Sequence, residues 1–239
     1  MRRSRAFVFL MSVFFTAPLW AGPPAPADRA LDDLEGSAKL HALIDRVVER
    51  QRALTSMTAG FVQTKHSALL LEATESSGQL SYRAPDAVRW DYSRPEKMVV
   101  LFAGDAVTTY HPGQARAERL KISKKQRRFV RALAGMQPLD DLTSHFKVSL
   151  ADPGGEAPYR LTLRPVGKMI GKRLRSIKIE VDRRLLLPVA VEYNEADGDS
   201  TRFEFYDLVI DPTLDDERFL LEFDAGVRVE TLDASAGVG

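Results

Sequence analysis

Hydrophobic and polar residues alternate through residues 78–111, a pattern that predicts a series of short antiparallel strands. On one such strand Val88, Trp90 and Tyr92 alternate with Arg89 and Asp91. Prolines and a Gly-Asp pair separate the runs, and these residues favour turns. The segment therefore predicts a β-meander, which is either an ordinary half-buried sheet or a concave apolar sheet that holds a ligand.

The period of the pattern changes to that of a helix before the meander. Leucine, isoleucine, valine and methionine recur at spacings of three and four through residues 40–57, which predicts an amphipathic α-helix of about five turns. Ser37 is the candidate N-cap of this helix. Because an apolar helical stripe must pack on another element and mainly strands follow, we expect the helix to pack on the sheet.

The sheet pattern is interrupted once and then resumes. Residues 125–134 and 139–146 predict two short helices, and further strands are expected from residue 147 onward. About ten strands predict a strongly curved antiparallel sheet that is open or nearly closed. The concave face of such a sheet is filled either by its own side chains or by a ligand, and the short mid-chain helices are the natural plug.

The first 21 residues have the pattern of a secretory signal peptide. Three arginines precede an apolar run from Ala6 to Trp20, and the small residue Ala21 follows it. The run is short for a transmembrane helix, which needs about 20 residues. A retained N-terminal anchor is the alternative. We expect residues 22–36 to be a flexible lead-in and residues 37–239 to form one domain. The chain has no cysteine, which excludes disulfides and a lipid-modified cysteine and, together with export, favours a Gram-negative periplasm.

Composition and charge narrow the classes of partner. The chain has 34 basic and 33 acidic residues, so without the three arginines of the leader 31 basic residues face 33 acidic ones, a net charge of −2. This balance argues against a nucleic-acid-binding protein. Residues 116–131 contain eight basic residues and one acid; they predict either a solvated face or a contact with anionic lipid or an acidic partner.

The motifs of common enzymes are absent. No GxSxG sequence occurs, and the four histidines lie far apart without an HExxH pattern. Residues 167–172, GKMIGK, are too short for a phosphate-binding loop. We therefore expect a binding protein without cofactor or metal; a metal site assembled by folding or an unrecognised catalytic site is the alternative.

Several short motifs occur in an order and spacing that resemble the periplasmic lipoprotein carriers of the LolA family. The resemblance extends from about residue 40 to residue 229 and rests on Phe61-x-Gln63, Gly78-x-Leu80, Arg89-Trp90, Tyr110-x-Pro112, Leu161-x-Leu163-x-Pro165, Leu187-Pro188 and Phe219. It implies an α+β fold in which a curved antiparallel sheet forms an incomplete β-barrel, with an N-terminal amphipathic helix and short lid helices.

The resemblance also implies partners and a mode of action. A carrier of this family accepts acylated lipoproteins from an inner-membrane ABC transporter complex and passes them to an outer-membrane receptor, using no ATP itself. The expected protein is monomeric and periplasmic, and its apolar cavity takes the acyl chains of the cargo. A paralogue with another lipid or acylated cargo, or an envelope-sensing binding module on the same fold, is the alternative.

Candidate site residues follow from the strand pattern and the resemblance together. The cavity lining is predicted to comprise Leu80, Tyr82, Val88, Trp90, Tyr92, Phe102 and Tyr110, and the lid Phe129, Leu133, Met136 and Leu142. The competing interpretation is that the cavity set forms a permanent core against the helix. If Val88 lines a cavity, Val88→Glu is expected to abolish cargo uptake and leave the fold intact.

One position departs from the family pattern. Where the family has an arginine that holds the lid closed, this chain has Ala84, and Arg83 lies one residue earlier. An offset of one residue along a strand sends a side chain to the opposite face. Arg83 is therefore the candidate lid lock only if a bulge shifts its strand.

Overall fold

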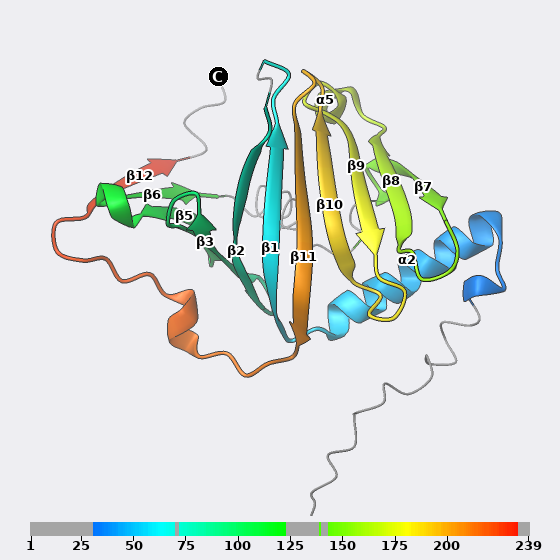
Figure 1. Cartoon of the computed structure of the whole chain (residues 1–239), viewed down its shortest axis with the longest axis horizontal. Coiled ribbons are helices and arrows are strands. Elements are labelled where there is room, and N and C mark those ends of the chain that lie inside the picture. The colour runs from blue at the N-terminus through cyan, green and yellow to red at the C-terminus, as the bar shows by residue number, and fades with distance from the viewer. Residues whose placement is uncertain (1–30, 70–71, 123–138, 140–142, 234–239) are drawn as a thin grey trace, which may run out of the picture.

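The computed structural model describes residues 31–69, 72–122, 139 and 143–233, and within them one large sheet dominates (Figure 1). An α-helix, α2 (Gly36–Ala53), precedes the sheet. The short helices are η1 (Pro112–Gln114), α5 (Lys168–Gly171) and η2 (Asp216–Phe219). The strands are β1 (Ser56–His66), β2 (Thr74–Arg83), β3 (Ala87–Arg94), β4 (Met98–Ala103), β5 (Ala106–His111), β6 (Arg116–Lys121), β7 (Phe146–Ala151), β8 (Tyr159–Pro165), β9 (Leu174–Val181), β10 (Pro188–Glu195), β11 (Ser200–Ile210) and β12 (Arg228–Asp233).

The twelve strands run in the order β12-β6-β5-β4-β3-β2-β1-β11-β10-β9-β8-β7. Every neighbouring pair is antiparallel except β12 and β6, which are parallel. The two outer strands, β12 and β7, do not pair with each other, so the curved sheet stays open. This confirms the predicted incomplete barrel of mainly antiparallel strands with an N-terminal helix.

Helix α2 lies on the concave face of the sheet, behind the strands in Figure 1. Its buried stripe, Leu43, Ile44, Val47 and Val48, packs on apolar side chains of β7 to β10; we call this the helix cluster. Two details of the predicted helix are wrong. The helix ends at Ala53 because the chain from residue 56 pairs with both β2 and β11, and its N-cap is Glu35, which makes no side-chain capping bond, rather than Ser37.

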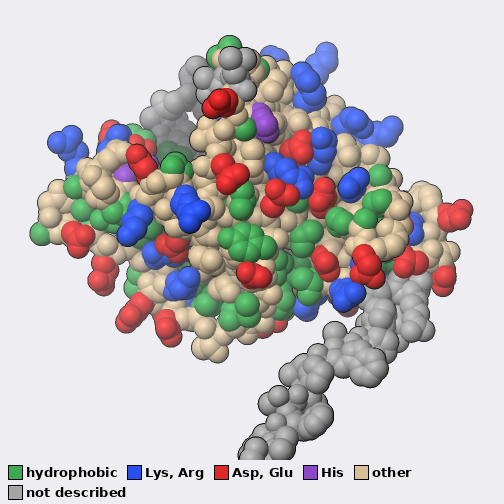
Figure 2. All heavy atoms as spheres, in the orientation of Figure 1, with side chains coloured by type: hydrophobic (Ala, Val, Ile, Leu, Met, Phe, Trp, Pro, Cys, Tyr) green, Lys and Arg blue, Asp and Glu red, His purple; other side chains and the backbone are tan. Residues whose placement is uncertain are grey.

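Over β9 to β11, the convex face of the sheet carries charged side chains in place of a second apolar layer. The Arg202 guanidinium lies 3.0 Å from Glu204 and 3.4 Å from Glu180, and Lys178 lies 2.8 Å from Glu192. Figure 2 shows acidic and basic side chains interspersed on this face. A face of this kind tolerates water, so the apolar residues of the same strands must find their cover on the concave side.

Ion pairs tie the start of α2 to the far half of the sheet. Lys39 lies 2.5 Å from the Asp152 carboxylate, which also pairs with Arg183. The Arg183 guanidinium lies 3.1 Å from Asp32 and stacks 4.1 Å from the centroid of the Tyr159 ring. Since the Lys39 and Arg183 side chains are only 12% and 14% exposed, both depend on the carboxylates for neutralisation.

We expect the protonation of Asp152 to lower the stability of the protein at acid pH. Burial alone would raise the pKa of its carboxyl, but hydrogen bonds from Lys39, the Gly154 amide and Arg183 outweigh it and lower the pKa to about 2 from an ordinary 3.8. Because the folded pKa lies below the unfolded one, the stabilisation is complete above about pH 4 and disappears as the pH falls through 2. Urea midpoints measured between pH 7 and pH 2 test this.

The substitution Asp152→Asn isolates the effect. It should lower the midpoint at pH 7, because Lys39 and Arg183 lose a charged partner, and it should flatten the decline between pH 4 and pH 2. Glu96→Gln, on the exposed β3–β4 turn, is the matched control and should keep the wild-type profile. A wild-type acid profile in Asp152→Asn would contradict this assignment.

Candidate functional site

Most of the predicted cavity residues meet on the concave face. Leu80 pairs with Trp90 and Tyr82 with Val88 across β2 and β3, and Val88 pairs with Phe102 across β3 and β4. Directly opposed side chains share one face of a sheet. The alternation seen in the sequence therefore builds one apolar surface across three strands.

Aromatic rings from strands far apart in the sequence complete this surface. The Trp90 ring centroid lies 4.8 Å from Phe61 on β1, and 5.1 Å and 6.0 Å from Phe203 and Phe205 on β11. The Phe61 ring also meets Tyr92 edge-on at 4.9 Å. We call the buried set Leu54, Met57, Phe61, Leu80, Tyr82, Val88, Trp90 and Leu187, with the rings packed on it, the aromatic cluster.

Sequence reasoning missed the contributions of β1 and β11 to this surface. Phe203 and Phe205 alternate with charged residues on β11, and that period-two pattern was the available signal. What the sequence did not reveal was that β11 pairs with β1. That pairing brings both rings to Trp90.

Burial within the aromatic cluster changes one expectation. Val88 is 1% exposed, whereas Tyr92 and Phe102 are partly buried. A glutamate at position 88 would place a carboxylate among apolar side chains, which costs several kcal/mol. Val88→Glu is therefore expected to weaken the fold, and Val88→Ala is the better probe of cargo contact.

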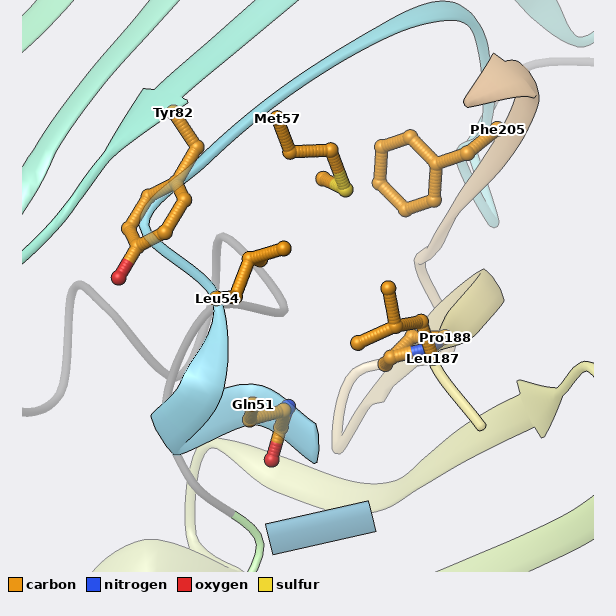
Figure 3. A pocket seen from close by; sticks show the side chains of 7 residues that line it. All are labelled: Gln51, Leu54, Met57, Tyr82, Leu187, Pro188 and Phe205. Atoms are coloured by element: carbon orange, nitrogen blue, oxygen red, sulfur yellow. The ribbon is translucent and has the colours of Figure 1, made fainter. Parts of the chain in front are cut away.

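A small pocket opens at the end of the aromatic cluster next to α2 (Figure 3). It is lined by Gln51, Leu54, Met57, Tyr82, Leu187, Pro188 and Phe205, and the side chains of Leu54, Met57, Leu187 and Phe205 point into a common space. Its volume is about 20 Å³, enough for about one water molecule. An acyl chain would enter only if these apolar walls separated.

Tyr92 bounds the aromatic cluster with a satisfied polar group. Its hydroxyl donates to Gln63 Oε1 at 2.9 Å, and burial raises the pKa of the phenol to about 12. The phenol is therefore neutral at physiological pH. A group with this pKa does not act as an acid or base near pH 7. The Tyr92 hydroxyl therefore makes a structural hydrogen bond at the edge of the apolar surface.

Tyr110 does not lie with the other predicted cavity residues. It pairs with Val99 across β5 and β4, a position out of phase with the Val88–Phe102 pair. Its ring is buried and lies 5.2 Å from Phe223, which follows η2 in the chain. The predicted placement of Tyr110 is corrected: the strand turn between β4 and β5 puts it on the convex face.

Arg83 also lies on the convex face, where it holds the C-terminal segment. Its guanidinium pairs with Asp216 and stacks 4.5 Å from the centroid of the Phe219 ring. No bulge shifts the register at this end of β2, because Arg83 pairs with Ala87 directly after Tyr82 pairs with Val88. The one-residue offset from the family position thus redirects the arginine away from the concave face.

Two further arginines fasten the same segment, and sequence reasoning assigned neither this role. Arg89 Nη1 donates to the Arg218 carbonyl at 2.9 Å, and its Nε bonds the Asp91 carboxylate at 2.9 Å. The Arg218 side chain donates from Nε to Ser81 Oγ at 2.7 Å. The segment from Asp216 to Leu220 is thereby held across β2 and β3, and Phe219 is buried.

The four predicted lid residues, Phe129, Leu133, Met136 and Leu142, lie outside the described residues. Leu139, between them in sequence, is described. It is 2% exposed in the helix cluster, and its amide donates to Gln51 Oε1 at 3.2 Å. Gln51 also lines the pocket of Figure 3, so α2 links the residue at 139 to the pocket wall.

The chemistry of the site is that of apolar contact. Within residues 31–233, apart from the undescribed gaps, no group of three or more histidine, aspartate or glutamate side chains is arranged to hold a metal ion. The described helices include none that is both long and apolar enough to span a bilayer. The residues gathered on the concave face offer rings and aliphatic groups, which suit an apolar ligand.

Comparison with known proteins supplies the family. The family model for "Outer membrane lipoprotein carrier protein LolA" matches residues 52–222. The chain belongs to the LolA family. The match runs from the end of α2 to just beyond η2 and includes every strand of the aromatic cluster.

Relatives within the LolA family are distant in sequence. The outer-membrane lipoprotein carrier protein of Halorhodospira halophila is 27% identical over 168 residues, which cover 69% of this chain and 74% of that protein. The protein of the same name from Pseudomonas aeruginosa is 24% identical over 205 residues, covering 81% of this chain and 92% of that protein. At this distance the family is shared while individual side chains have diverged.

Solved structures share the fold. An uncharacterized conserved protein from Thermus thermophilus superposes with a TM-score of 0.51 at 12% identity, over 82% of this chain and all of that one. MucB superposes with a TM-score of 0.50 at 16% identity, over 78% of this chain and 64% of MucB. The fold is therefore shared with proteins of low sequence identity and different length.

Proposed function

We propose that this protein is a periplasmic carrier that binds the acyl chains of lipoproteins on its concave face and ferries them from the inner to the outer membrane. The observation that carries the proposal is the aromatic cluster, an apolar surface built by β1 to β4 and β11 beside a pocket that α2 covers. The cavity contacts are assigned to Leu80, Tyr82, Val88, Trp90, Tyr92 and Phe102.

The physical need for a carrier follows from the cargo. Each methylene exposed to water costs about 0.8 kcal/mol, so a protein with several acyl chains does not cross an aqueous compartment alone. In this proposal the narrow pocket of about 20 Å³ belongs to a closed form, whose walls separate for the cargo and reform after it leaves. Release is then favoured by recovered packing among apolar residues, and no nucleotide is needed.

The route and the partners extend the proposal. Residues 1–21 direct export, residues 37–239 form the carrier domain, and the monomer takes cargo from an inner-membrane ABC transporter complex and gives it to an outer-membrane receptor. The protein is a binding protein, and its action is transfer without chemical change of the cargo. The family match and the carrier names of its relatives support this route.

The deciding experiment is release of lipoproteins from spheroplasts. Purified mature protein is added to spheroplasts that display labelled lipoproteins, and the soluble fraction is examined for a one-to-one complex. An authentic LolA-family carrier serves as the positive control, and buffer alone as the negative one. Soluble acylated cargo supports the proposal, whereas no release by folded protein beside a working control refutes it.

The small pocket also favours a second candidate, an envelope-sensing binding module whose concave face is permanently filled. In that case the aromatic cluster is core, and a protein partner binds elsewhere. Mass spectrometry of the protein purified from cells separates the two functions. Lipid or acylated peptide that co-purifies with the wild type, and is lost in Val88→Ala, supports the carrier; protein free of lipid supports the module.

A further inference from the structure

Three loops meet at one end of the sheet, and together they form what we call the loop tip: residues 67–69, 166–173 and 196–199. Asp199 Oδ1 accepts hydrogen bonds from the Ala68 amide at 2.8 Å and the Ser67 hydroxyl at 3.1 Å. The Ala196 amide donates to the Arg173 carbonyl at 3.1 Å. The β10–β11 turn thus fastens the loop after β1 to the loop that contains α5.

The loop tip presents the most exposed large apolar side chains among the described residues. Leu69 is 94% exposed, Met169 86% and Val166 74%, whereas the other exposed large apolar residues range from 42% to 59%. Single exposed apolar residues are ordinary on soluble proteins. Here three large apolar side chains on adjoining loops are almost fully exposed. This grouping suggests that a ligand covers them.

Positive charge surrounds these side chains. Residues 164–175 contain five basic residues and no acidic one. Lys168, Lys172 and Arg173 are exposed, and none of them forms an ion pair within the part of the chain that the structure describes. Figure 2 shows basic side chains at the top of the molecule, where Figure 1 places α5.

Both acidic residues of the loop tip accept hydrogen bonds from neighbouring residues. Asp199 accepts the two bonds that anchor residues 67 and 68, and Asp197 Oδ1 accepts the Asp199 amide at 3.1 Å. Glu195, just before the loop tip, hydrogen-bonds to the turn through its backbone amide and carbonyl groups. These two carboxylates serve the internal structure of the turn, whereas Lys168, Lys172 and Arg173 are exposed.

We propose that the loop tip docks on the surface of an anionic phospholipid bilayer, with Leu69, Val166 and Met169 entering the headgroup region. Apolar side chains flanked by lysine and arginine are the combination that binds the membrane interface, since burial of the apolar groups and attraction to anionic lipids act together. The long lysine and arginine side chains can reach the phosphates while their stems follow the apolar groups inward.

A bilayer fits these side chains better than a protein surface does. Leu69 lies on one loop and Val166 and Met169 on another, and α5 has only four residues, so these side chains share no continuous helix or strand face that a complementary protein surface would match. The headgroup region needs no shape complementarity. The loop tip also lies at the opposite end of β1 from Met57, which lines the pocket of Figure 3, so docking leaves that pocket facing away from the lipid.

Vesicle co-sedimentation tests the proposal without any lipoprotein, so its outcome is independent of the carrier function. Purified protein is mixed with vesicles of phosphatidylglycerol and phosphatidylethanolamine, or of phosphatidylcholine alone. We expect binding to the anionic vesicles that weakens at high salt. The double variant Leu69→Ser, Met169→Ser should bind about tenfold or more weakly, and Lys168→Glu should also reduce binding.

Matched controls lie elsewhere on the same sheet. Val209→Ser changes an exposed apolar residue of β11, and Arg184→Glu reverses an exposed charge in the β9–β10 turn at the other end of the strands. Both should bind as the wild type does. Equal binding by the loop-tip variants and these controls, or no binding of the wild type to anionic vesicles, would overturn the proposal.

The lack of cysteine in the chain permits a direct measure of insertion. Met169→Cys carries a single polarity-sensitive fluorophore, and Val209→Cys carries the same label as a control. A blue shift at position 169 alone on adding anionic vesicles supports insertion. If neither label shifts, while the loop-tip variants still lose lipoprotein transfer between membranes, the tip binds a protein and the bilayer assignment is wrong.

Discussion

Gly78→Ala is expected to cause a large loss of stability, about 3 kcal/mol or more. A Cβ at this position would lie 2.0 Å from the Asp91 carbonyl oxygen and 2.9 Å from the Tyr92 Cα. Both are backbone atoms of β3, so no side-chain rotation relieves the contact. The β2–β3 register already shifts between Ser77 and Gly78, and β3 would have to move away, taking the Trp90 ring with it.

Gly60→Ala is the matched control for this prediction. A Cβ there would lie 2.3 Å from the Tyr206 ring, also a prohibitively short contact, but Tyr206 is 45% exposed and its ring can rotate outward. The expected cost is about 1 kcal/mol. Urea unfolding of the two variants and the wild type compares them directly, and equal losses would show that β3 accommodates the methyl group.

Trp90→Ala is expected to lower the free energy of unfolding by about 3–5 kcal/mol and to remove binding of an apolar ligand. The ring is 5% exposed and contacts Phe61, Phe203 and Phe205, so its loss leaves a cavity between β3 and β11. Chemical denaturation measures the stability, and titration with a fluorescent fatty acid measures the binding.

Trp90→Phe separates packing from recognition. A smaller ring keeps part of the contact, so the stability should fall less than in Trp90→Ala, while the altered shape of the cluster should still weaken fatty-acid binding. Val209→Ala, at a position 52% exposed on the convex face, should change neither quantity. Unchanged fatty-acid binding by a folded Trp90→Ala would exclude this ring from the ligand site.

Much of the fold was accessible from the sequence because local patterns decide it. The alternation at Val88, Trp90 and Tyr92 gave the strand and the face that these side chains share, and the pairs with Leu80 and Tyr82 confirm it. The helical period of Leu43 and Val47 likewise predicted the stripe that packs on the sheet. The end of that helix was missed because strand pairing with β2 and β11 overrides helical spacing from residue 56.

Site residues were harder to place because the face of a strand depends on register. Tyr110 has the composition of a cavity residue, yet its pairing with Val99 sends it to the convex face against Phe223. Arg83 and Arg89 likewise hold a C-terminal segment more than 100 residues later in the chain, and Arg218 in that segment donates back to Ser81 on β2. No local pattern encodes such a contact, since it forms only after the sheet is assembled.

By itself, the sequence determined that this protein has an amphipathic helix, a long succession of short strands and an apolar strand face, because these follow from the spacing of hydrophobic residues within single elements. The tertiary structure alone decided which strands are neighbours, that Phe203 and Phe205 complete the surface around Trp90, and that Leu69 and Met169 project from one end. Those outcomes depend on pairing between segments that are distant in the sequence. Such pairing is stabilised only when the whole sheet has assembled, so no single element encodes it.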